Sequence, residues 1–180
     1  MFVGKHIDFL EELATSTNYE NSKAKEIESF KTQTKTKGGY YLARFEASQN
    51  GEKPMSKAKQ TVWNNITQPN ASIAAGKMYN STNYTSDLIN SYSWDTAIVF
   101  IQNYGGEENK DYSKHTSKNK SLAKTGESGD KVLNIYDMAS NCAEWTTETS
   151  TYAGYPCTAR GGYYNDDVDY TSYRYSDTTT

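Results

Sequence analysis

The stretch that most constrains the fold of this chain is SDLINSYSWDTAIVFIQNYGG, residues 86–106. Its apolar residues recur every three or four positions, as they do on one face of an α-helix. They are Trp94, Ala97, Ile98, Phe100 and Ile101. The pair Gly105-Gly106 is expected to end this helix. Only 35% of the 180 residues are hydrophobic, so the core must be small and must rely on aromatic side chains.

Three shorter regions before this helix also favour particular elements. Residues 69–79 are expected to form a helix that begins near Pro69 and buries an apolar face made of Ile73, Ala74 and Met78. The segment YYLARFEAS, residues 40–48, is rich in aromatic residues, which is typical of a strand. Residues 49–60 are expected to form a polar loop.

The second half of the chain joins short strand-like pieces with polar loops. The loop at residues 105–130 is rich in Lys, Ser and Gly, and loops of this length are uncommon unless they serve a function. The strand-like pieces that follow it are NIYDM, AEWTTE, TARGGYY and TSYRY. Helices and one strand followed by several short strands indicate the α+β class.

The charge and the apolar pattern argue against two kinds of partner. The net charge is −3 with both signs mixed and no basic patch, so nucleic acid is not expected. No apolar run approaches the roughly 20 residues that a membrane-spanning helix needs. The first residues, MFVGKHIDFLEEL, carry acids within the apolar pattern and lack a small-residue cleavage site, so they do not resemble a signal peptide.

The two cysteines, Cys142 and Cys157, leave the redox compartment open. Two cysteines do not make a zinc site, and the two histidines, His6 and His115, lie far from them in the sequence. A disulfide between them and a pair of reduced, buried thiols are both compatible with the sequence.

The segment NIYDMASNCAEWT, residues 134–146, carries the most specific motif, and its Trp145 is expected to pack in the core. It resembles the G-L-Y-D-M-x-G-N-V-W-E-W-T signature of the formylglycine-generating enzyme (sulfatase-modifying factor) family. Three other segments resemble motifs of that family in the same order; they are YYLARFEAS, the region of Trp94-Asp95, and Arg160-Gly161-Gly162. The resemblance covers about residues 38–175.

The resemblance implies a C-type-lectin-like fold, in the variant shared by that enzyme family and by the variable proteins of diversity-generating retroelements. Such a fold has short strands and two helices beneath long loops. It would occupy residues 38–180, after an N-terminal helical arm over residues 1–37, where residues 6–16 and 21–33 are weakly amphipathic. Family members continue into a final strand, so either the domain is truncated at its C-terminus or another segment pairs with the open sheet edge.

The resemblance also implies a structural Ca²⁺ in the segment of the signature motif. Its candidate ligands are Asn141, Glu144 and the carbonyl of Cys142. A side-chain amide and a carboxylate three residues apart on a tight turn can point at one site, and Ca²⁺ prefers oxygen ligands of these kinds. The alternative is that Asn141 caps a turn and Glu144 accepts backbone N–H bonds.

The catalytic chemistry of the resembled family is not expected here. That family oxidises a substrate cysteine with two cysteines of its own, which bind copper and follow the R-G-G motif. The matching positions hold Asp166 and Thr171, and no cysteine follows Cys157. Without thiolates there is neither a soft copper site nor covalent thiol chemistry, so no copper is expected.

The C-terminal segment has the composition of a binding surface. From Thr151 to the end, seven of thirty residues are Tyr, and most of the others are Asp, Ser, Thr, Asn or Gly. Tyr supplies contact area at low entropic cost, and small polar residues supply adaptable hydrogen bonds. The residues expected to contact a ligand are Tyr163, Tyr164, Asn165, Asp166, Asp167, Asp169, Tyr170, Tyr173 and Tyr175.

The sequence therefore predicts a non-catalytic module that binds a protein or glycan on another cell or particle. Its resemblance to retroelement variable proteins implies a hypervariable C-terminal surface. It also implies a protein that is displayed on a bacterial or phage surface, secreted, or associated with a virion. One alternative is an active or degenerate copper oxidoreductase of the formylglycine-generating type. Another is a structural domain of a phage tail or cell-envelope protein.

Overall fold

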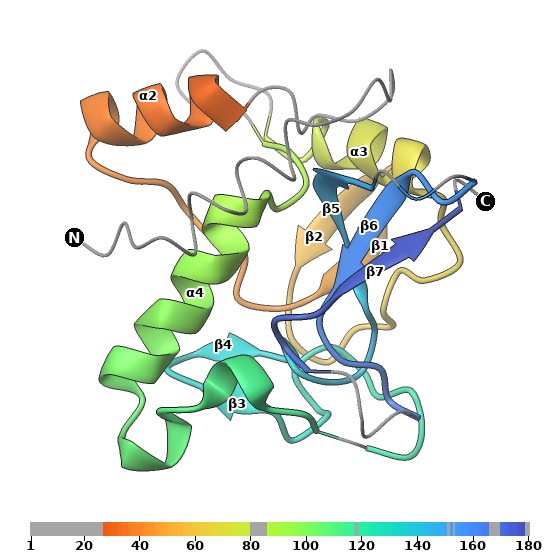
Figure 1. The fold of residues 1–180 in the computed structure, drawn as a ribbon. Helices are drawn as coiled ribbons and strands as arrows, with labels where there is room; N and C mark the ends of the chain where they lie inside the picture. The colour runs from red at the N-terminus through yellow and green to blue at the C-terminus, as the bar shows by residue number, and fades with distance from the viewer. Residues whose placement is uncertain are drawn as a thin grey trace.

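The protein has a mixed α+β architecture in its computed structural model (Figure 1). The structure describes residues 27–79, 86–117, 119–150, 152, 154–165 and 170–178. Within them lie three α-helices, which are α2 (Ile27–Lys37), α3 (Gln68–Ala75) and α4 (Ser91–Tyr104). The strands within the described residues form three small antiparallel sheets. The α+β class that the sequence predicts is thus confirmed.

Helix α4 forms where the apolar pattern predicts it. Asn90 caps its start, because the side-chain oxygen accepts a hydrogen bond from the Ser93 N–H at 2.9 Å. At the other end the N–H of Gly105 donates to the Ile101 carbonyl and the helix stops. The polar loop that follows contains two short 3₁₀ turns, at Glu107–Asn109 and Tyr112–Lys114.

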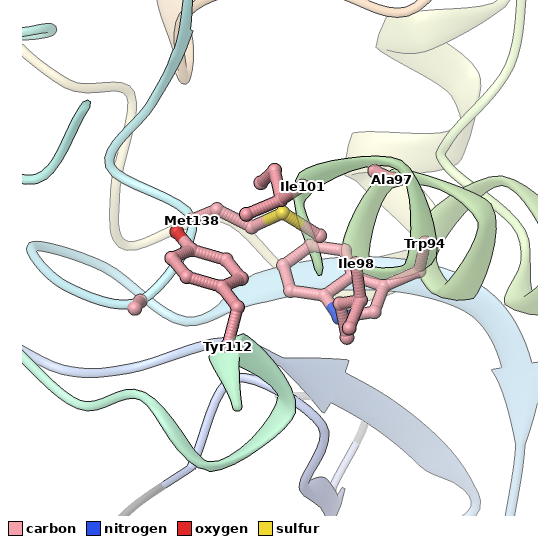
Figure 2. Packing of buried hydrophobic residues seen from close by; sticks show 7 residues of the cluster. Trp94, Ala97, Ile98, Ile101, Tyr112 and Met138 are labelled. Atoms are coloured by element: carbon pink, nitrogen blue, oxygen red, sulfur yellow. The ribbon is translucent and has the colours of Figure 1, made fainter. Parts of the chain in front are cut away.

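The largest hydrophobic cluster is built on one face of α4 (Figure 2). Its buried members are Trp94, Ala97, Ile98, Ile101, Tyr112, Met138 and Ala139. Figure 2 shows Met138 extending across the cluster from the ring of Tyr112 towards that of Trp94. The core therefore joins the helix to the segment that carries the signature motif.

The strands are short and each sheet pairs neighbours in the sequence. They are β1 (Ala47–Asn50), β2 (Lys53–Ser56), β3 (Lys131–Val132), β4 (Ile135–Tyr136), β5 (Glu144–Thr149), β6 (Cys157–Arg160) and β7 (Arg174–Asp177). The largest sheet has the order β5-β6-β7, with β6 buried throughout and β7 at an edge. An isolated bridge between Ile89 and Thr146 ties β5 to the start of α4.

The strand expected at residues 40–48 is largely wrong, and so is the polar loop expected at residues 49–60. Residues 40–46 are not in a strand, because the backbone N–H and carbonyl of Phe45 bond to the side-chain hydroxyl of Ser56 and not to the backbone of β2. The strands β1 and β2 form a hairpin closed by a two-residue loop that begins at Gly51, with φ +64°. The Asn50-Gly51 pair is a hairpin signal that the prediction passed over.

Three apolar side chains are also placed differently from their prediction. Trp145 was expected in the core but is half-buried, with its indole N–H donating to the Ile66 carbonyl at 2.8 Å. Trp94 fills the core instead, at 3% exposure. Ile73 and Phe100 are 60% and 44% exposed. With about 3.6 residues per turn, Phe100 lies beside the buried face of α4, not on it.

The predicted N-terminal arm is described only in part. Helix α2 covers the end of the second predicted amphipathic segment, and the first one, residues 6–16, lies outside the described residues. Phe30 of α2 packs against Tyr92 of α4 and lies 5.0 Å from the Tyr40 ring. None of the helices in the described part of the chain has the length and apolar character that crossing a bilayer needs.

Candidate binding surface and its buried supports

The residues predicted to bind a ligand are partly at the surface. Tyr163, Tyr170 and Tyr173 are 42%, 36% and 45% exposed, and Asn165 is exposed as well. Two further residues, Tyr164 and Tyr175, are half-buried. The remaining predicted residues, Asp166, Asp167 and Asp169, lie outside the described residues.

The tyrosine rings contact one another in groups. Tyr170, Tyr173 and Tyr175 form a chain of edge-on contacts, with ring centroids 5.0 and 6.4 Å apart, and we call them the C-terminal tyrosine cluster. The rings of Tyr163 and Tyr164 form a separate pair at 4.4 Å. Such contacts hold the rings in defined positions, so less side-chain entropy is left to lose on binding.

Two exposed tyrosines were not singled out from the sequence. Tyr152 and Tyr155, between β5 and β6, are 67% and 42% exposed, and their rings lie 5.5 Å apart. They belong to the same Tyr-rich segment, and that composition is the signal that could have included them.

The turn that carries the C-terminal tyrosine cluster is anchored from below by Thr171. This residue is fully buried, and both its N–H and its hydroxyl donate to the His115 carbonyl, at 3.0 and 2.9 Å. Its own carbonyl accepts the indole N–H of Trp94 at 2.9 Å. Tyr173 closes the turn by donating its N–H to the Tyr170 carbonyl. The backbone beneath the rings is thus tied to the hydrophobic core.

Beneath β6 and β7 lies a buried square of two arginines and two acids. The fully buried guanidinium of Arg160 donates to Glu148 and to Asp95, at 2.7 Å each. Arg174 donates to the second oxygen of Glu148 at 2.5 Å and of Asp95 at 3.4 Å. The square connects α4, β5, β6 and β7, and its two positive charges balance its two negative ones.

Two glycines follow Arg160 where the chain leaves β6. A Cβ atom at Gly162 would lie 2.0 Å from the Ala139 carbonyl oxygen, so no side chain fits there. Gly161 has φ +91°, a backbone conformation that glycine adopts without strain. Arg160 is thus a buried structural anchor, and the two glycines after it let the chain turn sharply.

The predicted calcium ligands lie in a second polar cluster, next to Glu46. Asn141 donates from its side-chain amide to one oxygen of Glu46 at 2.5 Å, and the N–H of Cys142 donates to the other at 2.9 Å. The amide oxygen of Asn141 accepts the Ala123 N–H at 2.8 Å. Glu46 was not predicted as part of this site, although it is the acid of the segment that resembles the family's strand motif.

The acids in this cluster resist ionisation. Burial, followed by the charge of Asp137, raises the pKa of Glu46 to about 8, although its hydrogen bond from Asn141 opposes the shift. Burial raises the pKa of Glu144 well above its ordinary value, and the charge of Glu46 adds to that effect. Burial likewise raises the pKa of the Cys142 thiol to about 12. A thiol with such a pKa is a poor nucleophile at neutral pH.

The predicted ligands differ in whether they have an oxygen available for a cation. Glu144 is half-buried, but its Oε2 atom is enclosed and has no hydrogen-bond partner in the described part of the chain. That oxygen fits a ligand role. The oxygen of Asn141, in contrast, is already engaged by the Ala123 N–H. Across the described residues, no group of three or more His, Cys, Asp or Glu side chains has the arrangement of a metal site.

Comparisons of the chain with protein-family models, with curated proteins and with solved structures found no match. The features that bear on function are therefore the Tyr-rich surface and the two buried polar clusters.

Replacing Arg160 with Met is expected to lower the free energy of unfolding by about 3–5 kcal/mol. The variant leaves Asp95 and Glu148 buried with only Arg174 to balance them. The control is Lys77→Met, which breaks the exposed Lys77–Glu52 pair and should change stability by less than about 0.5 kcal/mol. Urea unfolding of both variants measures the difference, and equal losses would contradict a special role for the buried square.

A second prediction concerns pH and Glu46. The pKa of Glu46 is raised from 4.5 to about 8 in the folded chain. At a pH between these two values, the chain therefore takes up a proton on this carboxylate when it folds. The corresponding stabilisation is complete below about pH 4.5 and is lost as the pH rises towards about 8. Glu46→Gln should therefore reduce the fall in unfolding free energy between pH 5 and pH 8, measured in urea with a chelator present. Glu52→Gln, at an acid whose side chain is 89% exposed, is the control and should retain the full fall. The same full fall in Glu46→Gln would refute the prediction.

Proposed function

We propose that this protein is a non-catalytic binding module whose Tyr-rich C-terminal surface contacts a protein or a glycan. The observation that carries the proposal is the display of exposed Tyr170 and Tyr173 on a turn whose central Thr171 is fully buried and hydrogen-bonded to the core. Rings held on a fixed backbone lose little freedom when they bind, and aromatic side chains dominate the binding energy of interfaces.

The proposed fold is C-type-lectin-like, of the type found in the formylglycine-generating enzyme family and in retroelement variable proteins. Two features support it. The four motifs occur in the family's order. The segment Arg160-Gly161-Gly162 also forms a tight, buried turn, and no side chain larger than that of glycine fits at Gly162. Under this proposal the domain covers residues 38–180, and the protein is displayed on a bacterial or phage surface.

The chemistry of the cysteines supports a binding role over an oxidoreductase. The positions that match the family's copper-binding cysteines hold Asp166 and Thr171. Of the two cysteines present, Cys157 is fully buried, and Cys142 has a pKa of about 12. Neither has the exposed, thiolate character that copper ligation or thiol oxidation uses.

Tyr173→Ala is expected to weaken ligand binding by about 1–3 kcal/mol while leaving the melting temperature nearly unchanged. The wild type is first screened on arrays of glycans and of purified bacterial surface proteins, and each ligand is then titrated against the variants. The control is Tyr104→Ala, which removes an exposed ring from α4, where Tyr104 is 65% exposed. The proposal would be refuted if the wild type bound nothing on the arrays. It would also be refuted if the wild type, Tyr173→Ala and Tyr104→Ala bound each ligand with equal affinity.

We also propose Ca²⁺ as a structural cofactor of the signature segment, held by Glu144 and the Cys142 carbonyl. The enclosed, unpartnered Oε2 of Glu144 supports it. A cation there would offset the repulsion between Glu144 and Glu46, which now contributes to the raised pKa of Glu144. Asn141 would join the ligands only by giving up its hydrogen bond from Ala123.

Calcium is expected to raise the melting temperature relative to chelator, because an ion that binds only the folded state stabilises it. The gain is about 2.7 kcal/mol at a hundredfold excess over Kd. Glu144→Gln should abolish the shift, whereas Glu127→Gln, at an exposed acid, should keep it. If elemental analysis finds no bound metal and the wild-type melting temperature does not change, calcium has no place in this structure.

A further inference from the structure

Exposed basic side chains gather where four separate segments of the chain meet. They form a group that we call the basic patch, and its members are Arg44, Lys57, Lys59, Lys124 and Lys131. Each member is exposed, and the group is spread along the chain from residue 44 to residue 131. The sequence analysis found no basic patch, because this one exists only where the fold brings distant segments together.

Buried Thr125 holds together the two loops that carry three of these lysines. The N–H of Lys59 donates to the Thr125 carbonyl at 2.8 Å, and the Thr125 hydroxyl donates to the Lys57 carbonyl at 2.6 Å. Lys124 directly precedes Thr125, whose side chain is fully buried. The backbone beneath the three lysines is therefore fixed.

Phe45 connects the other two members of the basic patch to these loops. Its N–H donates to the hydroxyl of Ser56, the residue before the first of the three lysines, at 3.1 Å. Its ring lies 4.5 Å from that of Tyr136, whose N–H donates to the Arg44 carbonyl at 3.1 Å. Lys131 pairs with Tyr136 across β3 and β4, and its ammonium nitrogen lies 5.4 Å from the centre of that ring.

The acids of the same segments leave the positive charge at the surface. Glu127 is exposed, whereas Glu46, Asp130 and Asp137 are buried. None of the ion pairs in the described part of the chain includes a member of the basic patch. A partner that approaches this surface therefore meets five exposed cations and one exposed carboxylate.

We propose that the basic patch binds an acidic polysaccharide, whose sugars carry carboxylate or sulfate groups. This site goes beyond the proposed binding function, because it uses none of the residues of the Tyr-rich surface. The ammonium group of a lysine attracts such anions as a point charge, and the guanidinium of Arg44 offers them two parallel N–H donors. A polymer that repeats its charge can contact several members at once, which adds to its affinity.

The surroundings of the basic patch favour a polysaccharide over a nucleic acid. Single-stranded nucleic acids stack their bases on exposed aromatic rings. The rings of Phe45 and Tyr136 are instead half-buried and packed against each other. Duplex DNA is read most often by a helix in its major groove, and each member of the basic patch lies in a loop or in β3.

The test measures binding of the full chain to fluorescent dextran sulfate by anisotropy, with neutral dextran of the same length as the control polymer. The chain should bind only the sulfated polymer, and the affinity should fall as salt is added. Duplex DNA and poly-glutamate are then added as competitors at equal charge concentration. Both should compete less well than unlabelled dextran sulfate.

The double variant Lys57→Gln, Lys124→Gln should weaken this binding by about ten- to thirtyfold, because each lysine near a polyanion contributes about 1 kcal/mol. The control is Lys35→Gln, Lys37→Gln, which removes the same charge from exposed positions of α2 and should change the affinity less than about twofold. Melting temperatures equal to that of the wild type establish that the variants are folded. If the first variant melts lower, Arg44→Gln, Lys131→Gln takes its place with the same expected loss.

Four results would overturn the inference. Dextran sulfate could fail to bind, or neutral dextran could bind equally well. Equal weakening by the patch variant and the α2 variant would show that net charge alone attracts the polymer. Stronger competition by DNA or by poly-glutamate than by dextran sulfate would assign the basic patch to a nucleic acid or to an acidic polypeptide instead.

Discussion

The arrangement of the largest sheet depends on the charge balance around Arg160. Its guanidinium is fully buried, a position that is tolerable only because Asp95 and Glu148 each lie 2.7 Å away. Since these acids come from α4 and β5, the pairing joins the main helix to the sheet. Arg174 completes the square from the edge strand. The position of β7, and of the Tyr175 ring it carries, is therefore set by the same four charges.

The second polar cluster meets the cost of buried charge in a different way. In the described contacts of Glu46, its carboxylate accepts hydrogen bonds from Asn141 and from the Cys142 backbone, and no basic side chain takes part. Burial raises the pKa of Glu46 and that of Glu144, which favours their neutral, protonated forms. In the square, by contrast, ion pairing offsets the cost of burying the charges. One cluster consequently acts as a fixed connection, while the other is expected to make stability depend on pH.

The sequence predicted the elements whose signals are local. The helix at residues 86–106, with its glycine stop, was found as α4, and the short strands of the second half were found as β4 to β7. The β1–β2 hairpin was missed because its polar residues carry no apolar alternation, so the Asn50-Gly51 turn was its one sign. The candidate surface was recognised by composition, but composition does not separate exposed Tyr173 from half-buried Tyr175.

The sequence by itself determined the α+β class, the amphipathic face and caps of α4, and a C-terminal segment rich in Tyr and Asp. These follow from residues close together in the chain. Only the tertiary structure decided that Trp94 and not Trp145 fills the core, and that Arg160 pairs with an acid 65 positions away. Burial and ion pairing depend on which distant segments meet, and a buried charge reveals its partner only when the fold has brought the two together.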